Sequence, residues 1–74
     1  MNIMTGVKAC YACRKQVKLK RNGKPHAALT VVEKKEYRRA APYWDEITYR
    51  CMTCGSLIES TNDPNEIAPF WWFV

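Results

Sequence analysis

Two cysteine pairs, CYAC at residues 10–13 and CMTCG at residues 51–55, decide the fold of this 74-residue chain. Two residues between the cysteines of a pair let a tight turn, or knuckle, point both sulfur atoms to one side. Two such knuckles that face each other complete the tetrahedral set of four sulfurs that zinc prefers. The spacing therefore predicts one metal ion held by Cys10, Cys13, Cys51 and Cys54.

The length of the chain explains why a metal is needed. With 74 residues, 47% hydrophobic and 26% charged, the sequence is typical of one small globular domain over residues 1–74. A chain of this size buries only about 60% of the surface that its unfolded form exposes. Apolar burial then barely offsets the entropy lost on folding, so we expect a metal-stabilised domain.

Both ends of the chain indicate a cytoplasmic protein with no membrane partner. Residues 1–8 contain neither a charged leader nor a long apolar run, so we expect no secretory signal peptide. Residues 67–74 are apolar but include Pro69, and they are far shorter than the roughly 20 residues that span a bilayer.

Zinc is the metal that this set of thiolates favours. A reducing cytosol disfavours two persistent disulfides, and a redox-active pair would need a helix start within a βαβ pattern that the sequence lacks. A four-thiolate iron site and cysteines that simply pack in the core stay open as alternatives. Four bound thiolates leave no position for water, so we expect one structural Zn²⁺ ion without hydrolytic chemistry.

The residues that follow the two knuckles differ. Gly55 follows the second knuckle, where the chain turns sharply away from the metal and a residue without Cβ adopts positive φ at no steric cost. Arg14 stands at the matching place after the first knuckle. This predicts either a slightly different knuckle or a small backbone strain there.

The two knuckles, each preceded by a β-like segment, resemble those of the zinc ribbon, a rubredoxin-like superfamily of small β-sheet modules. The resemblance covers the knuckles alone, which 37 residues separate in this chain. It implies a small, mostly-β domain made of two β-hairpins that carry the two CxxC knuckles. Members of this superfamily bind nucleic acid, RNA polymerase and other proteins, so the resemblance implies a binding module.

A basic hairpin is predicted over residues 14–32. Residues 17–20 alternate apolar and basic side chains, which is typical of a strand with one buried face. Asn22-Gly23 favours a two-residue hairpin turn, and the β-branched residues at the end of the range 26–32 favour a return strand. A helix is the alternative for residues 26–32, because Pro25 and two alanines weaken the strand pattern.

The next segment, residues 33–42, is predicted to be a mobile basic segment or short turn that Pro42 ends. Like charges recur at i,i+4, which disfavours a helix. Alternation before Cys51 and apolar residues after Gly55 then predict a second-knuckle hairpin over residues 46–60.

Charge points to an anionic partner for the first half of the chain. Residues 1–39 hold 11 of the 12 lysines and arginines, whereas residues 40–74 carry a net charge of −4. Contact of the basic hairpin with DNA or RNA phosphates is one interpretation, and a solvated face that protects a small sheet from aggregation is the other. The candidate nucleic-acid-binding residues are Arg14, Lys15, Lys18, Lys20, Arg21, Lys24, Arg38 and Arg39.

An aromatic tail, residues 66–74, holds four of the nine aromatic residues. Such side chains could cover a bare sheet face, which is the interpretation we favour. Alternatively, Trp71 and Trp72 could anchor a partner, such as a larger complex of the polymerase kind. The chain would then be a protein-interaction adaptor.

Catalysis has little support in the sequence. His26 is the single histidine, and no acid or hydroxyl residue stands in a recognisable relation to it. A lone histidine of this kind is usually a surface residue. Asp45 and Glu46 are adjacent, so a strand would point them to opposite faces. We therefore expect no enzyme activity and no small-molecule substrate.

Overall fold

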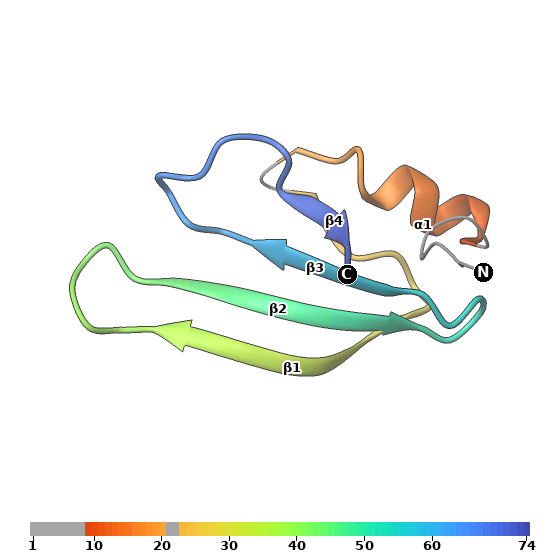
Figure 1. The fold of residues 1–74 in the computed structure, drawn as a ribbon, viewed down its shortest axis with the longest axis horizontal. Coiled ribbons are helices and arrows are strands. Elements are labelled where there is room, and N and C mark those ends of the chain that lie inside the picture. The colour runs from red at the N-terminus through yellow and green to blue at the C-terminus, as the bar shows by residue number, and fades with distance from the viewer. Residues whose placement is uncertain (1–8, 21–22) are drawn as a thin grey trace.

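A computed structural model describes residues 9–20 and 23–74 of the chain, in which one helix and four strands are found (Figure 1). They are α1 (Tyr11–Gln16), β1 (Leu29–Tyr37), β2 (Trp44–Cys51), β3 (Leu57–Thr61) and β4 (Trp71–Phe73). The strands form one antiparallel sheet in the order β1-β2-β3-β4. The helix lies at the end of the sheet where β2 turns into β3, and the β1–β2 turn lies at the opposite end.

No helix within the described ranges has the length and apolar character needed to cross a lipid bilayer. The four-stranded sheet and one short helix make this a small, mostly-β domain, as the sequence predicts. The strands form one continuous four-stranded sheet rather than two separate hairpins.

The second knuckle connects β2 to β3. Cys51 ends β2, and its backbone N–H donates to the carbonyl oxygen of Ser56 at 2.9 Å, which closes the turn. Gly55 donates its N–H to the carbonyl of Cys51 at 2.8 Å and adopts a φ of +79°. Strands β2 and β3 therefore flank the second knuckle, where the sequence pattern predicts two strands.

The aromatic tail forms β4 and pairs with β3. Trp71 lies opposite Ser60 and Phe73 opposite Ile58. Trp71 is only 4% exposed, and its ring stacks on that of Tyr49 with centroids 5.7 Å apart. The indole ring of Trp71 therefore closes the core of the domain itself.

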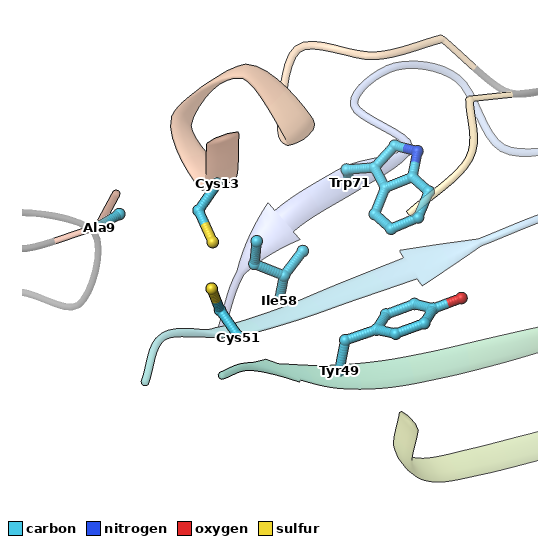
Figure 2. Packing of buried hydrophobic residues seen from close by; sticks show 6 residues of the cluster. All are labelled: Ala9, Cys13, Tyr49, Cys51, Ile58 and Trp71. Carbon is cyan, nitrogen blue, oxygen red and sulfur yellow. The ribbon is translucent and has the colours of Figure 1, made fainter. Parts of the chain in front are cut away.

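The core is small and includes two of the cysteines (Figure 2). Its buried members are Ala9, Cys13, Tyr49, Cys51, Ile58 and Trp71. Of these, Cys13, Cys51 and Ile58 are the most completely enclosed, each with at most 1% of its surface exposed. The thiols of the two knuckles and the apolar core are thus parts of one cluster.

The hairpin predicted over residues 14–32 is wrong in its first strand. The first knuckle continues directly into α1, because the N–H of Arg14 donates to the carbonyl oxygen of Cys10 at 3.0 Å. Residues 17–20 follow in turns, and Val17 packs against the core whereas Leu19 is 37% exposed. In a strand, Val17 and Leu19 would point to the same face, because they are two residues apart. Here they do not.

The turn predicted at Asn22-Gly23 is only partly within the described residues. Asn22 is outside them, whereas Gly23 is described. Residues 29–32 of the expected return strand do form a strand, but they begin β1 and pair with β2 rather than with residues 17–20. The strain expected at Arg14 is also absent, since the described non-glycine residues all have negative φ.

The mobile segment or short turn predicted over residues 33–42 is wrong in its first half, because Glu33–Tyr37 continue β1, whereas residues 38–42 do lie in the β1–β2 turn. Like charges at i,i+4 do disfavour a helix, but in an antiparallel pair the neighbours lie across the sheet. Lys35 faces Glu46, and the ring of Tyr37 stacks on that of Trp44 with centroids 4.6 Å apart. Cross-strand partners therefore give this charged stretch its strand geometry.

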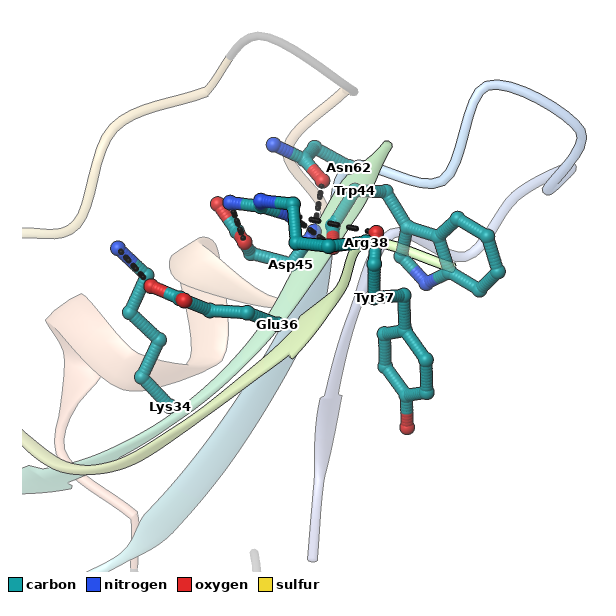
Figure 3. Close-up of polar contacts among 7 residues, drawn as sticks. All are labelled: Lys34, Glu36, Tyr37, Arg38, Trp44, Asp45 and Asn62. Carbon is teal, nitrogen blue, oxygen red and sulfur yellow. Dashed lines mark hydrogen bonds and ion pairs between the residues drawn. The ribbon is translucent and has the colours of Figure 1, made fainter. Parts of the chain in front are cut away.

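Polar contacts fasten the far end of β1 and β2 (Figure 3). Arg38 pairs with the carboxylate of Asp45 at 2.8 Å and also donates to the carbonyl oxygen of Trp44 at 3.0 Å. The side chain of Asn62 accepts the backbone N–H of Asp45 at 2.7 Å. These bonds hold the turn between the two strands to the end of β3.

Candidate metal centre

Helix α1, strand β2 and the β2–β3 turn bring the cysteines together. Cys10 precedes α1 and Cys13 lies within it, one helical turn apart, while Cys51 ends β2 and Cys54 lies in the β2–β3 turn. The Sγ atoms of Cys13 and Cys51 point toward each other across the gap between helix and sheet (Figure 2). The sequence-predicted ligands therefore converge at one end of the molecule.

The distances between sulfur atoms are short. Cys10 Sγ lies 3.8 Å from Cys51 Sγ, and Cys13 Sγ lies 3.7 Å from Cys54 Sγ. Each knuckle thus contributes one sulfur to each of these contacts. None of the four cysteines is in a disulfide.

A fifth donor, His26, joins the cluster. Its Nε2 atom lies 3.3 Å from Cys13 Sγ, and one of its ring nitrogens is among donor atoms that all lie within 4.8 Å of one another. That set comprises Cys10, Cys13, His26 and Cys51, and Cys54 adjoins it through Cys13. These five residues could hold a metal ion.

Gln16 explains why His26 reaches the cysteines. The side chain of Gln16 is 2% exposed, and its Oε1 atom accepts the backbone N–H of His26 at 2.9 Å. Its Nε2 atom donates to the carbonyl oxygen of Lys24 at 3.0 Å. Because Gln16 follows Cys13 by three residues, it lies on the same side of α1 and fastens the returning chain over that cysteine.

The sequence alone predicts a surface position for His26 and indicates no role for Gln16. A single histidine, 13 residues after the nearest upstream cysteine, is not part of a short sequence motif that indicates a metal ligand. The polar Gln16 in a lysine-rich stretch looks like any exposed position. Their pairing depends on how the chain returns after α1, which no local pattern encodes.

Hydrogen bonds to two of the sulfurs favour thiolates. Burial raises the pKa of the Cys54 thiol, but the Ser56 hydroxyl and backbone N–H groups outweigh it and lower that pKa to about 6. The pKa of Cys51 is likewise lowered, since N–H groups of Cys54 and Thr53 outweigh the opposing effect of burial. The donor from Thr53 lies 3.4 Å from Cys51 Sγ.

Cys13 has the opposite environment. Burial, followed by its contacts with the three other thiols, raises the pKa of Cys13 well above the ordinary range. Four sulfurs this close cannot all carry charge in a largely buried site without a cation to offset it. A bound metal ion would supply that cation.

The predicted nucleic-acid-binding residues do not form one surface. Arg14 and Lys15 lie on α1, and Lys18, Lys20 and Lys24 lie in the chain that follows it, all of them exposed. Arg21 is outside the described residues. Arg38 and Arg39 lie in the β1–β2 turn at the other end of the sheet, where Arg38 is already paired with Asp45.

The two tryptophans proposed as partner anchors also differ. Trp71 is buried in the core, as the own-core interpretation of the tail predicts. Trp72 is half-buried, and its indole N–H donates to Glu59 at 3.0 Å. Neither indole is a freely exposed anchor.

Comparison of the chain with protein-family models, with curated proteins and with solved structures finds no match.

Proposed function

We propose that this protein is a zinc-stabilised binding module, related in its knuckles to the zinc ribbon, that contacts nucleic acid through the basic surface around α1. Two parts of this proposal have separate support. The first is the metal, and the second is the surface that the metal holds in place.

The sulfur geometry supports zinc held by Cys10, Cys13, Cys51 and Cys54. Zn–S bonds of about 2.3 Å in a regular tetrahedron place neighbouring sulfurs about 3.8 Å apart. The two sulfur contacts that link the knuckles measure 3.8 and 3.7 Å. Such a closed site would supply folding energy and no open position for catalysis.

Iron would accept the same four thiolates, so the metal itself must be identified. Elemental analysis of the purified protein should give one zinc per chain, and the solution should be colourless. A red protein with stoichiometric iron would contradict this part of the proposal.

The observation that carries the nucleic-acid proposal is a concentration of unpaired positive charge beside the metal centre. Five exposed basic residues lie on α1 or shortly after it, and the sequence has no acid before Glu33. In the described part of the chain, none of these five takes part in an ion pair. They form the α1 basic surface: Arg14, Lys15, Lys18, Lys20 and Lys24.

An exposed aromatic ring lies on the same surface. Tyr11 is 69% exposed at the start of α1, and the Nζ atom of Lys15 lies 5.3 Å from the centre of its ring. A flat ring beside cations is the combination that single-stranded nucleic acid uses, since a base stacks while its phosphates meet lysines. Tyr37 and Trp44, in contrast, stack on each other and are half-buried.

The test is binding of the zinc-loaded protein to mixed-sequence single-stranded and duplex oligonucleotides, measured by fluorescence anisotropy from 50 to 200 mM salt. Affinity should fall steeply with salt, because each neutralised phosphate releases counterions. Lys18→Glu with Lys20→Glu should weaken binding by at least about tenfold and flatten the salt dependence.

Arg39→Glu with Arg50→Glu is the matched control, because it makes the same change in net charge at two exposed residues that lie outside the α1 basic surface and take part in no ion pair within the described chain. It should change affinity far less. Equal losses in both double variants would show that net charge alone governs binding. Absence of binding at 50 mM salt would contradict the proposal, and a protein-interaction role would then be the alternative.

A further inference from the structure

The metal centre offers five donors for four positions, so one of them must have another role. Cys54 and His26 are the two in question, because Cys10, Cys13 and Cys51 belong to both possible sets. The distance from His26 Nε2 to Cys13 Sγ, 3.3 Å, does not decide between them. A nitrogen and a sulfur bound to the same tetrahedral zinc would lie roughly 3.5 Å apart, close to the length of an N–H···S hydrogen bond.

The other ring nitrogen of His26 decides the question. Ala28 donates its backbone N–H to His26 Nδ1 at 3.2 Å, so Nδ1 acts as an acceptor. A neutral imidazole carries its single proton on the nitrogen that is not the acceptor, which here is Nε2. If Nε2 instead bound a metal, the proton would sit on Nδ1 and would face the N–H of Ala28, leaving two donors opposed.

On this basis we infer that His26 is a positioning residue that donates its Nε2 proton to the thiolate of Cys13, and that Cys54 is the fourth metal ligand. The inference rests on the proposed zinc site. The contacts of the two ring nitrogens place the proton on Nε2.

His26 gives Cys13 a hydrogen-bond partner from outside the cysteines, as two of the other sulfurs also have. Cys51 Sγ is reached by the N–H of Thr53 at 3.4 Å, and Cys54 Sγ lies 3.2 Å from the hydroxyl oxygen of Ser56. For Cys13, the hydrogen-bond partner from outside the four cysteines, within the described chain, is His26. A zinc ion with four thiolates leaves the site with a charge of −2, and donors to the sulfurs spread that charge.

The support for His26 is itself fixed by α1. The buried side chain of Gln16 holds the backbone N–H of His26 and the carbonyl of Lys24. Cys13 and Gln16 are three residues apart on the same helix, so the helix that positions the ligand also positions the ligand's donor. His26 is therefore held at its backbone by Gln16 and at its ring by Cys13, both of which belong to α1.

The decisive measurement uses the wild-type protein loaded with zinc. Long-range ¹H–¹⁵N NMR spectra distinguish a protonated ring nitrogen from one that holds a lone pair or a metal. We expect Nε2 of His26 to carry the proton and Nδ1 to lack one. A proton on Nδ1 with a metal-bound Nε2 would overturn the inference.

Variants loaded with Co²⁺ give a second readout, because the thiolate-to-metal charge-transfer absorption grows with the number of bound thiolates. His26→Gln should keep the four-thiolate spectrum and near wild-type zinc affinity, since the glutamine amide can donate in place of Nε2. His26→Ala should keep the spectrum but weaken zinc binding by about 10- to 100-fold. Cys54→Ser should lose the band of one thiolate.

The reverse pattern, in which Cys54→Ser keeps the wild-type spectrum and both His26 variants change it, would overturn the inference while leaving a metal site intact. A wild-type chain that binds neither Co²⁺ nor Zn²⁺ would instead overturn the proposed metal centre itself, and the role of His26 with it. The two failures are therefore distinguishable.

Discussion

Gly55 has a backbone conformation that other residues adopt only at a cost. Its φ of +79° lies in the left-handed region, and a Cβ added there would meet no atom within 4 Å. The cost of substitution therefore arises from the backbone alone. Gly55→Ala should lower the free energy of unfolding of the metal-loaded protein by about 1–2 kcal/mol in urea titrations, whereas Gly55→Asn should cost less.

Gly23 provides the contrast. A Cβ there would lie 2.6 Å from the Cβ of Leu19, so Gly23→Ala is opposed by a steric contact instead of by φ. Asparagine at position 23 should be at least as costly as alanine. If alanine and asparagine were equivalent at position 55, the left-handed conformation of the second knuckle would be contradicted.

The two knuckles show what a motif predicts and what it leaves out. CxxC followed by glycine predicts the turn at Cys51–Gly55 because only the local backbone is involved. The same spacing at residues 10–13 begins a helix, since the N–H of Arg14 donates to the carbonyl oxygen of Cys10 four residues earlier. His26 has no local signal, because its position depends on Gln16 and on the path of the chain after α1.

Strand β4 is the element that completes the hydrophobic core. It covers the outer edge of β3 and places Trp71 over Tyr49. Truncation after Ala68 should leave a chain that melts far lower or fails to fold even with saturating zinc, since losing a buried tryptophan alone costs about 3–5 kcal/mol. Thermal unfolding followed by circular dichroism is the measurement.

Ile67→Ser is the control for that truncation, because Ile67 is 79% exposed and precedes β4. It should melt close to the wild type. An unchanged melting temperature in the truncated protein would mean that the tail does not close the core, and would return Trp71 and Trp72 to the role of interface residues.

The strands differ in how far the sequence predicts them. Alternation before Cys51 and the apolar residues after Gly55 indicate β2 and β3 directly. The charged half of β1 gives no such signal, because its stability comes from partners on β2, such as Trp44 opposite Tyr37. A strand whose side chains are exposed along nearly its whole length is recognisable only once its neighbour is known.

In the whole domain, the cysteine cluster that could hold a metal and the hydrophobic core overlap, because Cys13 and Cys51 belong to both. Cys13 and Cys51 are as completely buried as Ile58, and the second knuckle joins β2 to β3 beside the start of β1. The four-cysteine cluster and the mostly-β class were predictable, because spacing and chain length constrain them. The fifth donor and the single continuous sheet were not, because both arise from contacts between segments distant in sequence.

Removal of the metal should therefore unfold the protein rather than loosen one end of it. An unfolded chain has no preformed site, so a zinc-binding free energy of roughly 10–16 kcal/mol becomes folding energy. A chelator should abolish the dispersed NMR spectrum, added zinc should restore it, and Cys51→Ser should behave like the chelated wild type. Met52→Ser, which changes a 67% exposed residue in the same knuckle, should remain folded. A dispersed spectrum from metal-free protein would show that Trp71, Tyr49 and Ile58 suffice as a core, and the metal would then be dispensable for the fold.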